Sequence, residues 1–389
     1  MNKKLLIVVY LGLYLISTGI TYAVLGSKGT FPETVDTTIS TTPGKRAKFK
    51  VDPSIPRDQV CPLNGAKYTK KESDVYDKRR PLAVMIENSE DARPQSSLSR
   101  ADIVYEALAE GWITRFMGVF YCNTPFENMP IAPVRSARTY FIDWVSEYDA
   151  LYNHVGGANR LGDNAAATDP RADALGQIDR YGIKDMDEFG IGFPDCYRNP
   201  DRLDHPVATE HQMVCFSENL YKIAEKKKWT NVDEDGIAWD KNFVEWKFKD
   251  DANSSEFGQV NNIKIVFSPG YTKYDVEWRF DPKTDSYTRY NGGVVHTDHE
   301  SKENIMAKNI IAQITKLQGP VDANGHFLYT TIGSGKAIIF QDGQSIVGTW
   351  SKPSRISRTR FFDAKGQEVS FDRGLIWIEL VSDQENVTY

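Results

Sequence analysis

A charge-free run near the N-terminus constrains where the rest of this chain can fold. Residues 5–25 read LLIVVYLGLYLISTGITYAVL, and Lys3 and Lys4 precede them. About 20 apolar residues span a bilayer as a helix, and flanking lysines stay on the cytoplasmic side. We therefore predict that residues 1–25 form a single-pass transmembrane helix, an uncleaved signal-anchor in the lipid bilayer of the cell membrane. The bulk of the chain would then be extracytoplasmic. A signal peptide cleaved after Ala23 is the competing interpretation.

Length and charge narrow the class of protein. A chain of 389 residues suggests about two domains, and 40% hydrophobic residues are enough for sizeable cores. The formal net charge is −6, and no long basic run occurs. Because proteins that bind nucleic acid usually present a basic face, we expect no nucleic acid partner.

The composition then divides the chain. Residues 26–78 are rich in Thr, Ser, Pro, Lys and Gly without an apolar period, which predicts a flexible stalk. An N-terminal domain is expected at residues 79–230, with a helix that carries Arg135 and Arg138 in its first turn and a second helix capped by Ser217. Its expected strands are residues 81–88, 100–108, 113–121 and 150–157. Strands with helices between them indicate a mixed α/β domain.

The remainder of the chain is predicted to be mainly β. Residues 231–260 are polar and acidic, which indicates a linker or an excursion. From residue 261 to 385, alternating segments such as YDVEWRF predict strands. The segment KAIIFQDGQSIVGTW predicts a hairpin that turns at Asp342-Gly343. The predicted fold class is therefore α+β, with an N-terminal mixed domain followed by a mainly antiparallel β domain.

Four cysteines fit an oxidising compartment. They are Cys61, Cys122, Cys196 and Cys215, and an extracytoplasmic location permits disulfides between them. Four cysteines allow three complete pairings, and the sequence does not choose among them. The pair Cys196 and Cys215 would close the shortest plausible loop. The spacing matches no zinc motif.

Several long strings resemble a known family. They are PLAVMIENSEDARPQSSLSRADIVYEALAEGWITRFMGVF, IAPVRSARTYFIDW and HVGGA in the first half, and YNGGVVHTDHES, GSGKAIIFQDGQSIVGTW and TRFFDAKGQEVSFDRGLIWIEL in the second. Together they resemble the YerB-like family of bacterial cell-envelope proteins over residues 61–383. The resemblance implies two extracytoplasmic domains of unknown function and a relation to lipoproteins. This chain lacks the cysteine for lipid attachment. Where relatives tend to have a Pro-His-Asn string, His211 keeps the histidine and Gln212 replaces the asparagine.

Four arginines raise the question of which anion they bind. Arg135 and Arg138 are three residues apart at an expected helix N-terminus, where the helix dipole is unfavourable to cations. With Arg93 and Arg115, they could form an anion-binding site for carboxylate or phosphate groups. The alternative is an internal network of ion pairs with acids of the same chain. Those acids are Glu87, Glu106 and Glu110.

Acids and histidines are the candidates for catalysis. Glu106 and His154 are the possible proton-transfer groups, and Glu110 is expected to neutralise the arginines. His296, Asp298 and His299 form the densest set of potential metal ligands, but their Gly- and Asn-rich surroundings favour solvated turn residues. No HExxH or HxH motif occurs, so we predict neither a metal nor a cofactor.

Two functions follow from these observations. The first is a membrane-anchored protein that binds an anionic cell-envelope ligand or a partner through an arginine-lined site, with Arg93, Arg115, Arg135, Arg138, Glu106, Glu110 and His154 as its residues. The second is a transferase or hydrolase that acts on a cell-wall polymer. The sequence identifies neither the ligand nor a protein partner.

Overall fold

The computed structural model describes residue 52 and residues 54–124 and 126–389. The predicted membrane helix at residues 1–25 and the first part of the predicted stalk lie outside these residues. Among the described residues, none of the helices combines the length and apolarity that a bilayer span requires. The described residues form one compact unit.

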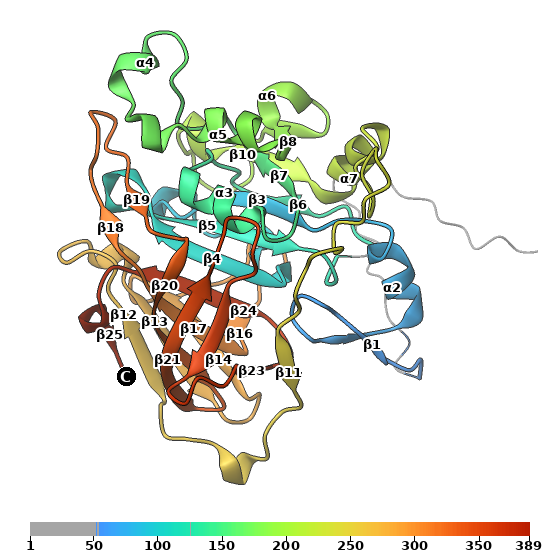
Figure 1. The fold of residues 1–389 in the computed structure, drawn as a ribbon, viewed down its shortest axis with the longest axis vertical. Helices are drawn as coiled ribbons and strands as arrows, with labels where there is room; N and C mark the ends of the chain where they lie inside the picture. Colours follow the sequence, from blue (N-terminus) through green and yellow to red (C-terminus); the bar gives the residue numbers. More distant parts are fainter. Residues whose placement is uncertain (1–51, 53, 125) are drawn as a thin grey trace, which may run out of the picture. The chain divides into compact units, whose positions relative to one another are not determined.

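A large mixed sheet runs through both halves of the sequence (Figure 1). Within the described part of the chain it has ten strands, in the order β22-β21-β20-β17-β24-β4-β5-β3-β7-β8. Its N-terminal strands are β3 (Leu82–Glu87), β4 (Ile103–Leu108), β5 (Thr114–Phe120), β7 (Leu151–His154) and β8 (Lys184–Asp187). Its C-terminal strands are β17 (Asn309–Ile314), β20 (Gly333–Gln341), β21 (Gln344–Lys352), β22 (Arg360–Asp363) and β24 (Ile376–Val381).

Strand β24 joins the two halves. It pairs in parallel with β17 on one side and with β4 on the other, and each of its residues is buried. A strand that is covered on both faces carries mainly apolar side chains. The sequence IWIELV fits this rule except at Glu379. The expected N- and C-terminal domains therefore share one continuous sheet.

A second sheet, mainly antiparallel, packs on the C-terminal half of the first. Its strands are β12 (Asn262–Ile265), β13 (Val276–Asp281), β14 (Ser286–Asn291), β15 (Val294–Val295), β16 (Met306–Ala307) and β25 (Val387–Thr388). Val276 and Trp278 are fully buried, as the alternation of YDVEWRF predicted. The Trp278 ring meets Trp377 of β24 edge-to-face at 5.3 Å between centroids, which joins the two sheets.

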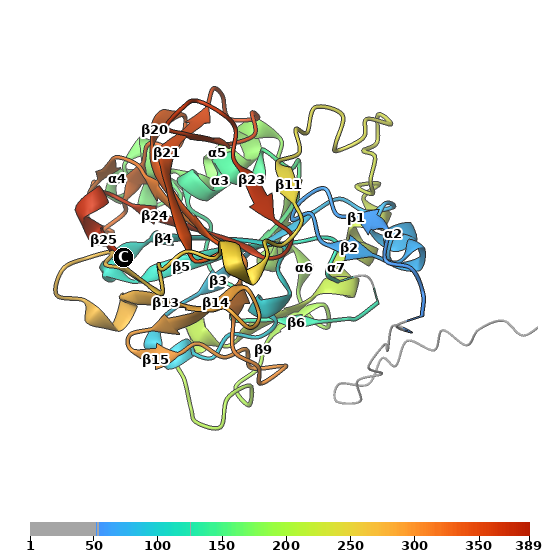
Figure 2. The same ribbon diagram turned by 90° about the horizontal axis from the view of Figure 1, so that it is seen from below.

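Short strands and helices complete the fold. The strands are β1 (Gln59–Val60) with β2 (Lys67–Tyr68), β6 (Pro130–Ile131) with β10 (Met213–Phe216) and β9 (Cys196–Arg198), β11 (Lys247–Lys249) with β23 (Ser370–Asp372), and β18 (Leu317–Gln318) with β19 (Leu328–Tyr329). The helices are α2 (Lys70–Tyr76), α3 (Thr139–Val145), α4 (Asn164–Ala167), α5 (Ala174–Tyr181), α6 (Glu188–Ile191) and α7 (Ser217–Lys226). Figures 1 and 2 place α3 and α5 beside each other next to the N-terminal strands of the large sheet.

The predicted α+β fold class is confirmed, and two helix starts differ from expectation. Helix α3 begins at Thr139, so Arg135 and Arg138 lie before it and not in its first turn. The reason is that residues 134–137 form bridges to Ile86 and Gly157, which hold the backbone extended. Helix α7 has Phe216 as its N-cap, because the Ser217 hydroxyl donates to the carbonyl of Glu127 instead.

The end of the expected stalk is folded. Residues 59–76 form β1, β2 and α2, and Thr69 and Glu72 make a reciprocal capping box at the start of α2. A disulfide between Cys61 and Cys122 ties this segment to the end of β5. The polar composition gave no sign of this structure. A disulfide and a helix cap stabilise the segment, whereas a folded segment is normally recognised by a periodic apolar pattern.

Candidate functional site

The segment that carries the arginines is fixed by its backbone. Val134 and Arg135 donate their N–H groups to the carbonyls of Met213 and Met85, at 2.9 Å each. Ala137 donates to Gly156 at 3.0 Å. The segment therefore lies between the end of β7 and strands β3 and β10, and its arginine side chains start from defined positions.

Arg138 binds a carboxylate of its own chain. Its Nε and Nη2 both donate to Glu110, which lies in a short 3-10 turn at Glu110–Trp112 after β4. Arg115 of β5 approaches the same carboxylate at 3.6 Å and donates to the carbonyl of Ser136 at 2.9 Å. Burial alone would raise the pKa of Glu110, but Arg138, Arg115 and His326 hold it at about 2. Glu110 thus stays ionised between two guanidinium groups, in the neutralising role that the sequence predicted for it.

Arg135 is paired less completely. Its Nε lies 3.1 Å from Glu87 Oε1, but the geometry makes no hydrogen bond, and this buried nitrogen is without an acceptor in the described structure. The other oxygen of Glu87 is 2.7 Å from Nδ1 of His211. The Arg135 side chain is 27% exposed, against 11% for Arg138. Arg135 is therefore the most exposed of the three arginines in the cluster.

The C-terminal half of the chain contributes a histidine at the edge of this cluster. His326 contacts Asp322 at 2.8 Å, and its Nε2 lies 3.9 Å from Glu110 Oε1. His326 was not predictable from the sequence, because the loop between β18 and β19 is far from Glu110 along the chain. We define the arginine cluster as Arg115, Arg135, Arg138, Glu87 and Glu110, with His211 and His326 at its edges.

Arg93 is held elsewhere. Its Nε donates to Asn88 Oδ1 at 3.0 Å, and its Nη2 donates to the carbonyl of Lys273 at 3.0 Å. Its guanidinium lies 5.1 Å from the centroid of the Tyr274 ring. Burial, with the charge of Arg289 second, lowers the pKa of Arg93 to about 10. Arg93 thus connects the two halves of the molecule and is separate from the arginine cluster.

Glu106 is also separate from the cluster. It is fully buried, accepts from Arg289 Nη2 at 2.6 Å and from Trp377 Nε1 at 3.2 Å, and lies opposite Glu379 on β24. Glu379 accepts from Trp278 Nε1 at 2.8 Å. Burial and the charge of Glu106 raise the pKa of Glu379 far above its usual range. Glu379 is therefore the carboxyl that holds a proton beside Glu106, whose direct arginine partner is Arg289.

Histidine 296 belongs to the same buried network and is not a solvated turn residue. Its Nδ1 lies 2.7 Å from Arg289 Nη1 and its Nε2 lies 2.6 Å from Gln95 Oε1. Burial and the charge of Arg289 lower the pKa of His296 well below its usual range, so the ring is neutral. Asp298, also buried, accepts from the backbone and hydroxyl of Ser99. Strand β14 turns Tyr287, Arg289 and Asn291 to one buried face, and Arg289 joins His296 to this network. The period-two alternation of β14 was the sequence signal that could have revealed this face.

His154 has two internal partners. The ring is fully buried, with Nδ1 at 2.8 Å from the carbonyl of Gly156 and Nε2 at 2.9 Å from Asp185 Oδ1. Glu106 and His154 therefore have different neighbours, and neither side chain is exposed to a substrate. His205 is exposed, and its Nδ1 lies 2.9 Å from Asp204 Oδ1.

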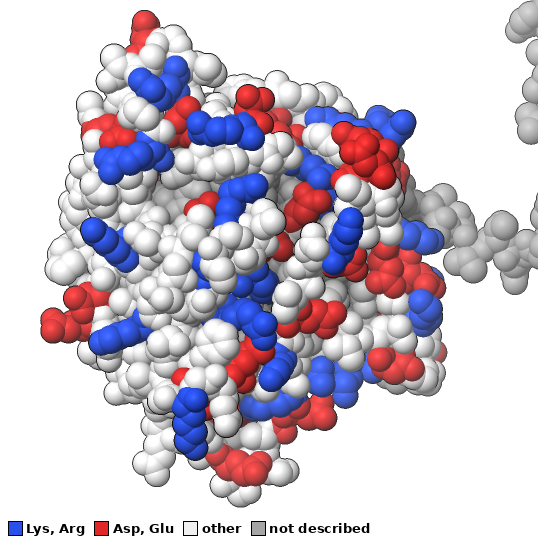
Figure 3. Space-filling model, in the orientation of Figure 1, with Lys and Arg blue, Asp and Glu red and all other residues white. Residues whose placement is uncertain are grey.

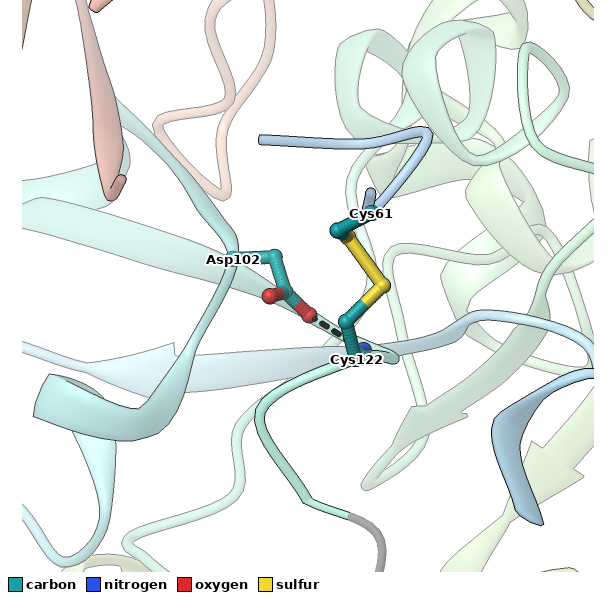
Figure 4. A group of neighbouring side chains, drawn as sticks. All are labelled: Cys61, Asp102 and Cys122. Atoms are coloured by element: carbon teal, nitrogen blue, oxygen red, sulfur yellow. Dashed lines mark hydrogen bonds between the residues drawn. A yellow bond between two sulfur atoms is a disulfide. The ribbon is translucent and has the colours of Figure 1, made fainter. Parts of the chain in front are cut away.

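Two disulfides crosslink segments of the N-terminal half, and a carboxylate lies beside one of them. Cys61 pairs with Cys122, and Cys196 pairs with Cys215, as one of the open pairings proposed. Figure 4 shows Asp102 next to the first disulfide, where its Oδ2 accepts from the N–H groups of Tyr121 and Cys122 at 2.7 and 2.9 Å. Both cysteines are consumed by the crosslink, so this group does not offer thiolates to a metal.

One face of the molecule is mixed in charge. Lysine, arginine and acidic side chains alternate over the face in Figure 3, and no broad basic area appears on it. On this face, an anion would therefore be recognised at a local site and not by a broad positive area.

The comparisons with known proteins agree with this architecture. Residues 66–230 match the N-terminal domain, and residues 263–378 the C-terminal domain, of a family described as protein of unknown function (DUF3048). The chain is 29% identical over 335 residues to "Putative lipoprotein YerB" of Bacillus subtilis (strain 168), covering 85% of this chain and 88% of that protein. The chain belongs to the YerB-like family. The crystal structure of YerB from Bacillus subtilis superposes with a TM-score of 0.67 at 26% identity, covering 85% of this chain and 99% of the YerB chain.

Proposed function

We propose that this YerB-like protein is held at the outer side of the cytoplasmic membrane and binds an anionic cell-envelope ligand at the arginine cluster. Two disulfides support the location, because disulfides persist in oxidising compartments outside the cytoplasm. The name of the Bacillus relative and the apolar run at residues 5–25 support attachment to the membrane.

The observation that carries the binding role is the charge balance of the arginine cluster. Three arginines face two glutamates, and Arg135 keeps an unpartnered Nε and a partly exposed side chain. Glu210 nearby is exposed, so water screens its charge. A carboxylate or phosphate group would approach the exposed part of the Arg135 side chain, since a guanidinium can bind either group in a bidentate contact. Wall polymers that carry either group are the ligand class we propose.

The test compares two substitutions of the same kind. Arg135→Gln should abolish retention of the full chain, purified in detergent, on purified cell walls while leaving the melting temperature nearly unchanged. Arg180→Gln is the matched control, because Arg180 is an exposed arginine on helix α5. Walls stripped of phosphate-containing polymers separate phosphate recognition from carboxylate recognition. Retention that survives in Arg135→Gln would refute the proposed site.

Membrane attachment has its own test. N-terminal sequencing of membrane-associated protein should find the chain intact from its start. A mature chain that begins at Val24 would rule out the uncleaved anchor and support the signal peptide.

A further inference from the structure

Three aspartates from distant parts of the sequence converge beneath the second sheet. Asp285 precedes β14, Asp342 forms the turn between β20 and β21, and Asp372 ends β23. One carboxylate oxygen from each lies within 4.8 Å of the others. The three residues are 8%, 6% and 0% exposed. We call them the aspartate triad.

The turn that carries Asp342 is buried for a structural reason. An Asp-Gly hairpin turn normally faces solvent, but here Gly343 donates its N–H to the Tyr287 hydroxyl of β14 at 3.1 Å. The carbonyls of Asp342 and Gly343 accept from Gly258 and Val260. The hairpin tip is therefore fixed against the second sheet, and Asp342 points into the protein.

Two lysines bind only half of the triad's oxygens. Lys249 of β11, which pairs with β23 in Figures 1 and 2, donates to Asp342 Oδ2 and Asp372 Oδ1. Lys308 donates to Asp285 Oδ2 at 3.0 Å and to Asp251 Oδ2 at 2.9 Å. Each aspartate of the triad thus places one oxygen on an ammonium group.

The remaining oxygen of each aspartate has no hydrogen-bond partner in the described structure. These atoms are Asp285 Oδ1, Asp342 Oδ1 and Asp372 Oδ2, and each is shielded from solvent. Gln341 Oε1 is also buried without a partner, although its amide nitrogen donates to Ser370 on the strand that carries Asp372. A buried carboxylate oxygen without a donor is costly, so one such oxygen on each member of this close cluster indicates a missing cation.

The charges favour a cation. The three carboxylates of the triad face two ammonium groups, so one negative charge of the triad is left unbalanced, and the half-exposed Asp251 that shares Lys308 is screened by water. Crowded carboxylates of this kind either take up protons or bind a metal.

We propose that the aspartate triad binds one hard divalent cation, with Ca²⁺ as the expected ion. Carboxylate oxygens select hard cations, and opposite ligands of Ca²⁺ at about 2.3–2.6 Å lie up to about 5 Å apart, which fits the triad. Mg²⁺ keeps several waters in a near-ideal octahedron, which a site this buried does not favour. The cation would join the β20–β21 hairpin, β23 and the β13–β14 turn. This proposal is independent of the arginine cluster.

The experiment uses the full chain in detergent, stripped with EDTA and then titrated with Ca²⁺, Mg²⁺ or Mn²⁺. We expect Ca²⁺ to bind at one equivalent by calorimetry and to raise the melting temperature. Asp342→Asn should weaken the affinity by more than about tenfold, since it replaces an anionic ligand atom. Asparagine keeps the turn, because the backbone of Asp342 has φ +53° and asparagine tolerates that region. Asp383→Asn, at an exposed aspartate that caps a 3-10 turn, is the control and should bind Ca²⁺ as the parent chain does.

Two results would overturn the site. One is the absence of saturable binding and of a melting-temperature response for all three ions in the parent chain, which needs no variant to fold. The other is equal affinity in the parent chain and in a folded Asp342→Asn variant. Binding of any of the three ions that Asp342→Asn alone removes supports the site and identifies its ion.

Discussion

Glu106 and Glu379 are direct neighbours on the parallel strands β4 and β24, and both side chains are fully buried. These strands belong to the two halves of the sequence, so the pair lies where the halves join. Arg289 binds Glu106, and Trp278 donates to Glu379. Two adjacent carboxyl groups with one arginine are stable together only when one of them holds a proton.

Glutamine at the two positions should have opposite consequences. At pH 7, Glu379→Gln should change the free energy of unfolding by less than about 1 kcal/mol, because glutamine resembles the protonated acid and still accepts from Trp278. Glu106→Gln should cost about 3–5 kcal/mol, because it leaves Arg289 buried without its counter-charge. Urea unfolding measures both, and equal costs would contradict the assignment of the proton to Glu379.

The same substitution should alter the pH dependence. The raised pKa of Glu379 means that the folded state binds more protons than the unfolded state above about pH 4.5. Stability contributed by this group is therefore highest at low pH and is lost as the pH rises toward its folded-state pKa. Glu379→Gln should flatten that decline, while the Asp383→Asn control should leave it unchanged.

Asp102 should be sensitive to amide substitution. Its Oδ1 accepts from Asn64 at 2.7 Å and its Oδ2 accepts from two backbone N–H groups, so an asparagine would turn a donor toward a donor. Asp102→Asn should cost about 1–3 kcal/mol, against less than about 0.5 kcal/mol for Asp383→Asn. Chemical denaturation with the Cys61–Cys122 disulfide intact is the measurement, and equal costs would show that these hydrogen bonds matter little.

Local signals in the sequence predicted much of the fold. The strands at 81–88, 100–108 and 113–121, and the Asp342-Gly343 turn, are observed because periodicity and turn chemistry act over a few residues. The start of α3 was placed too early, since the bridges that hold residues 134–137 extended come from β-structure far away in the chain.

The site was predictable only in part. The sequence offered Glu87 and Glu110 as partners of the arginines, and the structure pairs them with Arg135 and Arg138. It also offered Glu106, whose partner is Arg289, 183 residues away. Burial of a charge depends on which strands become neighbours, and the parallel pairing of β24 with β4 leaves no local trace in the sequence.

The two disulfides should stabilise the chain unequally. Cys61 and Cys122 are 61 residues apart, and Cys196 and Cys215 are 19 apart. A crosslink that acts by restricting the unfolded chain stabilises more when its loop is longer. Replacing both cysteines of the first pair with serine should lower the free energy of unfolding by about 4 kcal/mol, and the same change at the second pair should lower it by about 3 kcal/mol. Urea unfolding of the two double variants tests the order, and a larger loss at the second pair would contradict the entropic account.

Substitution of Arg138 should affect mainly stability, whereas substitution of Arg135 should affect mainly ligand binding. Arg138→Gln removes both hydrogen bonds to Glu110 and leaves that buried carboxylate to Arg115 and His326, so we expect a loss of about 3–5 kcal/mol. Because the pKa of Glu110 is lowered to about 2, its contribution is fully present above about pH 4.5 and is lost as the pH falls toward 2. Arg138→Gln should therefore weaken this acid-dependent loss, whereas Arg135→Gln should preserve it. Unfolding curves between pH 2 and pH 7 distinguish the two variants, and an unchanged acid limb in Arg138→Gln would remove Arg138 as the main partner of Glu110.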